Sequence, residues 1–180
     1  ASVDENSSTS DTIYTVTARD PDDNTITYGL SGDDADYFSI NTSTGAINLN
    51  LSANYEAKSS YAITASASDG TLLDSKDVLI NVSDLNESPS ITSSASASFN
   101  ENGAIATAAY SIISADPESD SLIYSISGAD ADYFSVDPST GEVFFKASPD
   151  YETKALYAFD ASVTDGHLAD TATILVSVND

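Results

Sequence analysis

The chain repeats itself once, with a period of 96 residues, and the two copies align without a gap. In the clearest match, residues 32–45 (GDDADYFSINTSTG) align with residues 128–141 (GADADYFSVDPSTG), and ten of these 14 positions are identical. A period of this length is too long for one unit of a solenoid, but it suits a small sandwich domain. The repeat therefore predicts two domains in tandem.

Within each copy, apolar and polar residues alternate with the period of two that is typical of half-buried strands. Val, Ile, Thr and Tyr dominate these runs, and turn signals such as Asp23-Asn24 and Asp69-Gly70 separate them. No stretch has a helical period, and we expect one helical turn at most, over residues 33–37. The alternating sets of the first copy are Tyr14, Val16 and Ala18; Ile26, Tyr28 and Leu30; Ile47, Leu49 and Leu51; Tyr61, Ile63, Ala65 and Ala67; and Val78, Ile80 and Val82.

Six or seven short strands in 96 residues indicate an all-β fold, an antiparallel Greek-key sandwich in each copy. Two large aromatic residues of the first copy, Tyr28 and Phe38, match Tyr124 and Phe134 of the second. Aromatic residues at matching places are predicted to anchor the two cores. The first copy has no residues that match positions 89–96, so its first strand is predicted to be truncated.

The composition excludes several classes of function. The net charge is −24, with 29 acidic residues against five basic ones, so neither nucleic acid nor an anionic membrane surface is a plausible partner. Disorder is disfavoured, because 41% of the residues are hydrophobic. The absence of Cys excludes disulfides, zinc–thiolate sites and thiol catalysis. No apolar run is long enough for a transmembrane helix, so no membrane insertion is expected; because the sequence starts in mid-pattern, we expect a piece of a longer array.

The acidic residues recur in short clusters at fixed points of the repeat. At the junction of the copies, the segment Val82–Pro89 (VSDLNESP) places oxygen-bearing side chains at Asp84, Asn86 and Glu87. A proline restricts the residue before it to extended conformations, so side chains and backbone carbonyls of this segment can face one cation. Calcium takes six to eight oxygen ligands at about 2.3–2.6 Å, which makes it the predicted ion.

This junction resembles the linker between cadherin repeats, D-x-N-D-N-x-P, and the variant resembles bacterial cadherin-like repeats. Further elements lie in the family's order in both copies, so the resemblance covers essentially the whole chain. In the first copy they are Glu5-Asn6, Asp20-Pro21-Asp22, Asn54-Tyr55-Glu56 and Asp69. In the second copy they are Glu101-Asn102, Asp116-Pro117-Glu118, Asp150-Tyr151-Glu152 and Asp165. The resemblance implies cadherin/immunoglobulin-like seven-stranded sandwiches over residues 1–84 and 91–180, joined by a calcium-binding linker over residues 85–90.

The resemblance also implies where the metal ligands lie, because in the family they converge at the junction of consecutive repeats. Two or three calcium ions are expected there. The first copy is expected to give Glu5, Asn54 and Glu56; the linker Asp84, Asn86 and Glu87 with the carbonyls of Leu85 and Ser88; and the second copy Asp116, Glu118 and Asp165. Weak or absent binding is expected at the two outer half-sites, which are Asp20, Asp22 and Asp69, and Glu101, Asp150, Glu152 and Asp180.

No catalytic residue is expected. His167 is the only histidine, and the first copy has Thr71 in its place. The paired carboxylates could suggest glycoside hydrolysis, but they are expected at the sandwich ends, and the chain has no Trp.

The predicted function is a calcium-binding, extracellular cell-surface module of an adhesin, in which calcium rigidifies the contact between neighbouring repeats. The alternative is a module that itself binds a polysaccharide or like modules.

Overall fold

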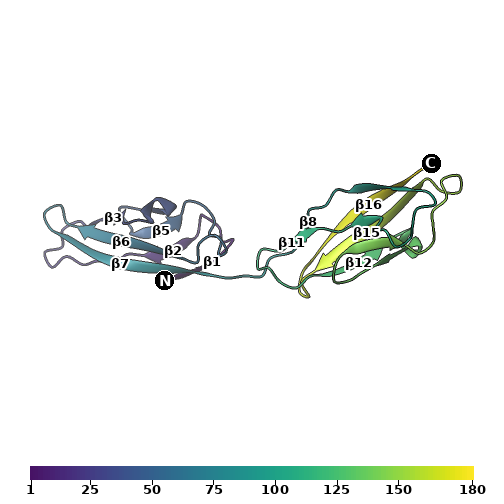
Figure 1. Ribbon diagram of the computed structural model, residues 1–180. Coiled ribbons are helices and arrows are strands. Elements are labelled where there is room, and N and C mark those ends of the chain that lie inside the picture. Colours follow the sequence, from purple (N-terminus) through teal and green to yellow (C-terminus); the bar gives the residue numbers. More distant parts are fainter. The chain divides into compact units, whose positions relative to one another are not determined.

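The computed structural model describes all 180 residues, which divide into two units, residues 1–85 and 86–180 (Figure 1). Each unit is a β-sandwich, so the all-β Greek-key fold predicted from the alternating pattern is confirmed. The helical content consists of one 3-10 turn per unit, η1 (Ala35–Tyr37) and η2 (Ala131–Tyr133). Neither turn could cross a membrane.

The first unit has two facing sheets. One has the strand order β1-β7-β6-β3 and the other the order β2-β5-β4. All neighbours are antiparallel except β1 and β7, which run parallel and pair Val3 with Val82. The strands are β1 (Ser2–Asp4), β2 (Thr12–Thr15), β3 (Thr27–Ser31), β4 (Phe38–Ile40), β5 (Ala46–Leu49), β6 (Ser60–Ser68) and β7 (Leu73–Ser83).

The second unit repeats this plan, with sheets β12-β15-β16-β9 and β10-β14-β13, and adds a short ladder of β8 with β11. It has more strand segments because its N-terminal stretch first pairs with β11 and then, as β9, runs parallel to β16. The strands are β8 (Ser90–Ile91), β9 (Ser96–Asn100), β10 (Tyr110–Ser111), β11 (Ser114–Ala115), β12 (Ile123–Ser127), β13 (Phe134–Val136), β14 (Glu142–Phe145), β15 (Leu156–Thr164) and β16 (Ala169–Asn179).

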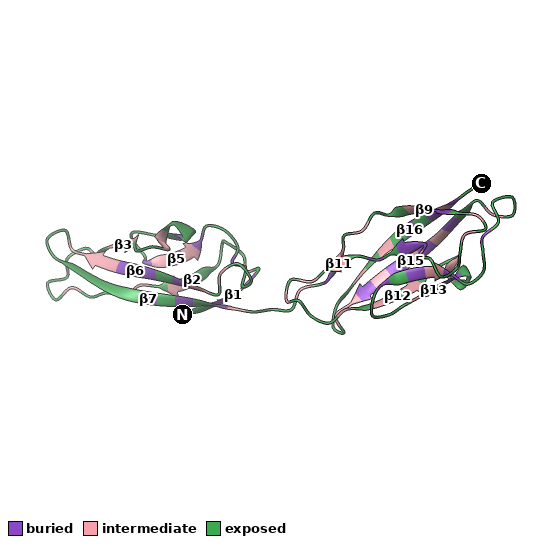
Figure 2. Cartoon of the chain, in the orientation of Figure 1, coloured by how far each residue is buried: buried purple, intermediate pink, exposed green.

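The inward-facing positions of the strands form one core in each unit (Figure 2). In the first unit Ile47, Ile63 and Ile80 are almost fully buried. In the second unit Phe134 is buried against neighbouring rings, with centroid distances of 4.4 Å to Phe145 and 5.0 Å to Phe159. The alternation in the sequence therefore located most of the core of the first unit.

The sequence prediction of core residues differs from the structure at three residues of the first unit. Leu51 is 72% exposed, because β5 ends at Leu49 and the chain turns away from the core. Ala18 is exposed and lies beyond the end of β2 at Thr15, although the alternation continued the strand through it. Tyr28, predicted as a core anchor, is only half-buried, and its hydroxyl oxygen accepts a hydrogen bond from the Ala18 N–H at 3.2 Å.

The turn between β4 and β5 requires glycine at position 45. Gly45 has φ +73°, and a Cβ there would lie 2.2 Å from the carbonyl oxygen of Val16. Gly70 also has a positive φ, +93°, but a Cβ at that residue would meet nothing within 4 Å. A substitution at Gly70 therefore measures the cost of the backbone conformation alone, whereas a substitution at Gly45 adds the cost of a steric clash.

We expect Gly45→Ala to destabilise the first unit much more than Gly70→Ala. The conformational penalty, about 1–2 kcal/mol, applies to both variants. Gly45→Ala must also displace the backbone at Val16, which adds roughly 1–3 kcal/mol. Calorimetry of the whole chain should show one of its unfolding transitions lowered, far more by Gly45→Ala; equal shifts in the two variants would contradict the close approach.

Candidate metal-binding sites

Glu5 is buried at the end of β1, with 1% of its surface exposed. Its Oε2 accepts a hydrogen bond from the N–H of Tyr55 at 2.9 Å, and its Oε1 accepts one from the N–H of Leu85 at 2.7 Å. The Tyr55 hydrogen bond, followed by the one from Leu85, holds the pKa of Glu5 below its ordinary value of 4.5 against the opposing effect of burial. The carboxylate therefore stays charged although it is buried.

Three carboxylates meet at this end of the first unit. Oxygen atoms of Glu5, Glu56 and Asp84 all lie within 4.8 Å of one another, and Glu56 and Asp84 are exposed. Two unit charges about 4 Å apart repel by roughly 1 kcal/mol in water and about 4 kcal/mol at the effective dielectric of a protein surface. A divalent cation would remove this repulsion and find oxygen ligands of the kind that calcium prefers. We call this set the base cluster.

The chain positions the base cluster through its backbone. Asn6, directly after Glu5, adopts φ +58°, and its N–H donates to the carbonyl of Ala53 at 3.0 Å. The Oδ1 atom of Asn54 accepts a hydrogen bond from the N–H of Ala57 at 2.6 Å, which closes the turn that carries Glu56. The sequence placed Asn54 among the metal ligands, and the structure gives its side-chain oxygen this local partner.

A lysine side chain outside the base cluster stabilises the same loop. Lys58 forms a salt bridge with Asp34 at 3.0 Å, and its Nζ lies 5.4 Å from the ring centroid of Tyr61. The carboxylate of Asp34 also accepts a hydrogen bond from the N–H of Ala62 at 2.8 Å. Lys154 and Asp130 repeat the arrangement in the second unit. The two salt bridges were not predicted from the sequence, although the recurrence of these four residues after 96 positions was a signal that could have found them.

In the second unit, Asn86 and Asp165 are hydrogen-bonded side chain to side chain. The Nδ2 of Asn86 donates to Asp165 Oδ2 at 2.8 Å, and the N–H groups of His167 and Leu168 donate to Asp165 Oδ1 at 2.6 Å each. These donors, the Asn86 side chain first, lower the pKa of Asp165 to about 2. Asp165 is therefore a fixed negative charge beside the segment that precedes β8.

Glu87, Asp116 and Glu118 add further carboxylates to this end of the second unit. The N–H of Glu87 donates to Glu118 Oε2 at 3.2 Å. The Oε1 of Glu118 and the Oδ2 of Asp116 are buried and accept no hydrogen bond. Burial raises the pKa of Glu118, and its side-chain contact with Glu87 adds to the rise. We call Asn86, Glu87, Asp116, Glu118 and Asp165 the top cluster.

Buried carboxylate oxygens without donors are costly, because each loses its hydration without replacement. A calcium ion would supply the missing positive charge, so the top cluster fits a hard cation by its chemistry. Ser88, which the sequence offered as a carbonyl ligand, directs its hydroxyl to the carbonyl of Ala169 at 3.2 Å. Leu85, predicted as another carbonyl ligand, contributes its N–H to Glu5.

The outer half-sites named from the sequence repeat these two clusters. Oxygen atoms of Glu101, Glu152 and Asp180 lie within 4.8 Å of one another, as in the base cluster. Asp150 accepts hydrogen bonds from the N–H of Glu152 and the hydroxyl of Thr153. In the first unit, the Oδ1 of Asp20 accepts the N–H of Asp22, and that of Asp69 accepts the N–H groups of Thr71 and Leu72.

We expect the charge of Glu5 to stabilise the first unit in the absence of metal. Because the pKa of Glu5 is lowered on folding, its contribution is present above pH 4.5 and is lost as the pH falls through the lower folded value. Glu5→Gln should lower the free energy of unfolding by about 1.5–3 kcal/mol at neutral pH, because Tyr55 and Leu85 would then donate to a neutral side chain in place of a carboxylate. The substitution should also reduce the loss of unfolding free energy, the acid limb of the curve, as the pH falls. This free energy is measured at each pH by urea denaturation in the presence of a chelator. Asp33→Asn, at an exposed acid outside the clusters, should leave that limb unchanged; a Glu5→Gln curve that parallels the wild type would contradict the assignment.

The comparisons with known proteins agree with one another. The family model for the cadherin domain matches residues 1–83 and 95–179. Human protocadherin Fat 4 is 30% identical over 169 residues, which are 87% of this chain and 3% of that protein, and human cadherin-related family member 2 is 26% identical over 178 residues, 92% of this chain and 14% of that protein. The chain thus spans a small part of these relatives.

Solved cadherin structures share the fold. The crystal structure of mouse cadherin-23 EC22-24 has a TM-score of 0.67 and 29% identity, over all of this chain and 62% of that one. Form II of human protocadherin-24 EC1-2 has a TM-score of 0.76 and 24% identity, over 99% of this chain and 93% of that one. With two family matches that together cover most of its residues, the chain belongs to the cadherin domain family, as two cadherin domains in tandem.

Proposed function

We propose that this chain is a calcium-binding tandem module of an extracellular adhesin, in which calcium stiffens the connection between its two domains. Cadherin domains generally bind calcium at the junctions between consecutive domains, and cadherin relatives are extracellular adhesion proteins. The observation that carries the proposal is the pair of buried carboxylate oxygens, on Asp116 and Glu118, that accept no hydrogen bond. A cation bound close to the segment that connects the domains would compensate for the lost hydration of these oxygens.

The proposed ligands are the residues of the base and top clusters. Glu5, Glu56 and Asp84 would supply carboxylates from the first unit, and Glu87, Asp116, Glu118 and Asp165 from the second. Calcium supplies the positive charge that lets these groups share one region. Two or three ions are proposed, since each takes six to eight oxygen ligands.

The proposed mechanism is electrostatic. Without ions, the carboxylates of the two clusters repel each other, and the connecting segment is free to bend. Bound ions would take oxygen ligands from both clusters, and bending would then break metal–ligand bonds. Extracellular calcium modules bind at about 0.1–1 mM, and an ion at about 100 times its dissociation constant stabilises the folded state by about 2.7 kcal/mol per site.

Equivalent positions of the two repeats give a matched test of shared binding. Asp84 and Asp180 occupy the same place in each copy, but in the 180-residue chain only Asp84 is followed by a second set of ligands. We expect Asp84→Asn to weaken tight calcium binding by tenfold or more and Asp180→Asn to change it little. Isothermal titration calorimetry measures both variants; equal losses would show that each cluster binds its ions alone.

Rigidity is tested separately by small-angle scattering with calcium and with chelator. We expect calcium to narrow the distribution of interdomain distances in the wild type and in Asp180→Asn, and to leave it broad in Asp84→Asn. An unchanged distribution in the wild type would refute the stiffening role even if ions bind. Sedimentation of the same samples reports whether like modules associate.

We further propose that the parent protein is a bacterial surface adhesin and that the module has no catalytic role. The first part rests on the linker ending Asn86-Glu87-Ser88-Pro89, which resembles bacterial cadherin-like repeats. The second rests on His167, which is the only histidine of the chain and whose place is taken by Thr71 in the other copy. Antibodies against the module should label intact cells of the source organism, and glycosidase and esterase assays should stay at background with calcium present.

A further inference from the structure

The loop that carries Glu56 into the base cluster is held on both sides of this residue. On one side, the N–H of Tyr55 donates to Glu5 Oε2 at 2.9 Å. On the other side, the side chain of Lys58 forms a salt bridge with Asp34 at 3.0 Å. The first contact belongs to the base cluster, and the second lies outside it. Glu56 therefore lies between one contact made by a candidate ligand and one made by residues that are not ligands.

The contact outside the cluster is better fixed than an ordinary surface ion pair. The Lys58 Nζ lies 5.4 Å from the ring centroid of Tyr61 and 6.0 Å from that of Tyr37. Asp34 Oδ1 contacts Lys58, while its Oδ2 accepts the N–H of Ala62 in β6 at 2.8 Å. The Asp34 side chain is only 13% exposed and that of Lys58 38%. An exposed pair contributes little because two long side chains must be ordered, but here two rings and a backbone donor set the geometry.

The backbone connects this ion pair to Glu56. The N–H of Lys58 donates to the carbonyl of Asn54 at 3.0 Å, and the N–H of Ala57 donates to Asn54 Oδ1 at 2.6 Å. Residues 54–58 thus form one closed turn. Since the Glu56 side chain is exposed, the backbone of this turn largely determines where its carboxylate lies. A displacement of Lys58 would therefore displace Glu56, two residues before it.

The second unit repeats the arrangement after 96 residues. Lys154 pairs with Asp130, and its Nζ lies 5.0 Å from the ring centroid of Tyr157. The turn that Lys154 ends carries Glu152, which is the equivalent of Glu56. The same ion pair therefore accompanies the same acidic residue in both copies.

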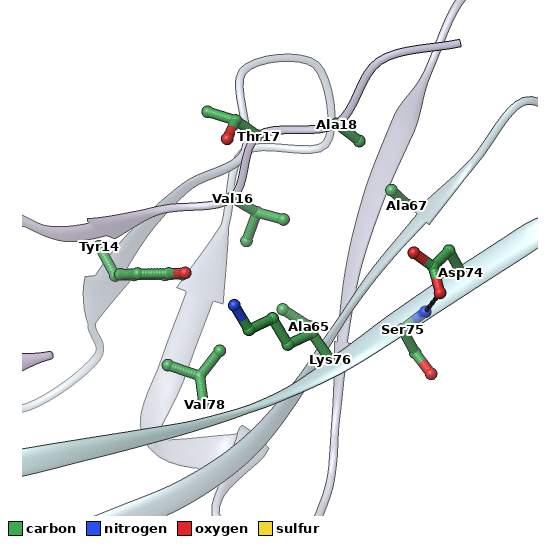
Figure 3. Close-up of a pocket in the computed structure, with 10 residues that line it drawn as sticks. All are labelled: Tyr14, Val16, Thr17, Ala18, Ala65, Ala67, Asp74, Ser75, Lys76 and Val78. Carbon is green, nitrogen blue, oxygen red and sulfur yellow. Dashed lines mark hydrogen bonds between the residues drawn. The ribbon is translucent and has the colours of Figure 1, made fainter. Parts of the chain in front are cut away.

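Basic residues are scarce in this chain, which makes the recurrence informative. Of the five, Lys58 and Lys154 alone form salt bridges and are half-buried, and the other three are exposed. Lys76 is a contrasting case, because Figure 3 shows its side chain directed towards Tyr14, and Ala172 stands in its place in the second copy. The two paired lysines thus recur at one place of the repeat, next to the turn that they close.

We propose that Lys58 is a positioning residue for calcium. Through its pairing with Asp34, it holds the carboxylate of Glu56 where an ion of the base cluster can bind it. The pairing also neutralises a positive charge that would otherwise repel the ion from two residues away. This role rests on the calcium site proposed above and adds to it two residues that do not touch the ion.

The direction of the change in calcium affinity separates positioning from simple electrostatics. Removal of a positive charge near a cation site by itself favours the cation, so an electrostatic role predicts that Lys58→Gln binds calcium more tightly. Positioning predicts the opposite, and we expect tight calcium binding to weaken about fivefold in isothermal titration calorimetry of the 180-residue chain. Lys58→Arg, which can keep both the ion pair and the contact with Tyr61, should bind calcium as the wild type does.

Two further variants control for stability and for net charge. Lys154→Gln removes the same contacts from the second unit, so its loss of unfolding free energy in chelator should match that of Lys58→Gln. It should leave tight calcium binding unchanged, because the turn that it disturbs carries Glu152 and no residue of the base cluster. Lys76→Gln measures the effect of net charge alone, since Lys76 lies near the start of β7 and Asp84 follows its end.

A second measurement needs no calcium. Amide hydrogen exchange at residues 55–57, followed by NMR in chelator, should be faster in Lys58→Gln than in the wild type and unchanged in Lys76→Gln. Unchanged exchange in Lys58→Gln would overturn the proposal. So would calcium binding that is as tight as in the wild type or tighter, or an equal loss of binding in Lys154→Gln, and these results would leave the calcium function intact. A wild-type chain that binds no calcium tightly would overturn both.

Discussion

A buried carboxylate, Glu5, joins three distant parts of the first unit. It follows β1, accepts an N–H from Tyr55 in the loop after β5, and accepts another from Leu85 just beyond β7. These bonds both keep its charge and fix where the connecting segment leaves the domain. The positions of the other two carboxylates of the base cluster, Glu56 and Asp84, depend on this one group.

The base and top clusters are prepared for a cation in different ways. In the base cluster, backbone donors already stabilise the charge of Glu5, and the other two carboxylates face solvent. In the top cluster, Asp116 and Glu118 each bury an oxygen without a donor, and the raised pKa of Glu118 reflects the same shortage of positive partners. The top cluster therefore has more to gain from an ion, since removing a charge from water without compensation is the larger cost.

The repeat also shows that equivalent acidic residues keep the same local contact in both units. Asp74 and Asp170 occupy equivalent places in the repeat, and both use Oδ1 to accept the N–H of the next residue. In the second unit, Asp170 also accepts a hydrogen bond from the N–H of Ile91 in β8 at 2.8 Å.

The sequence by itself determined the tandem repeat, the sandwich class and most of the core, because period-two alternation and a 96-residue self-match are local, readable signals. It also named the acidic residues, since oxygen ligands in a recurring pattern have few structural uses. Only the tertiary structure decided the surroundings of individual residues: Asn54 accepts the N–H of Ala57, Leu85 donates its N–H to Glu5, Glu118 has a raised pKa, and Leu51 lies outside the core. These outcomes depend on burial and on donors supplied by residues far away in the chain, and neither can be read from the residues alone.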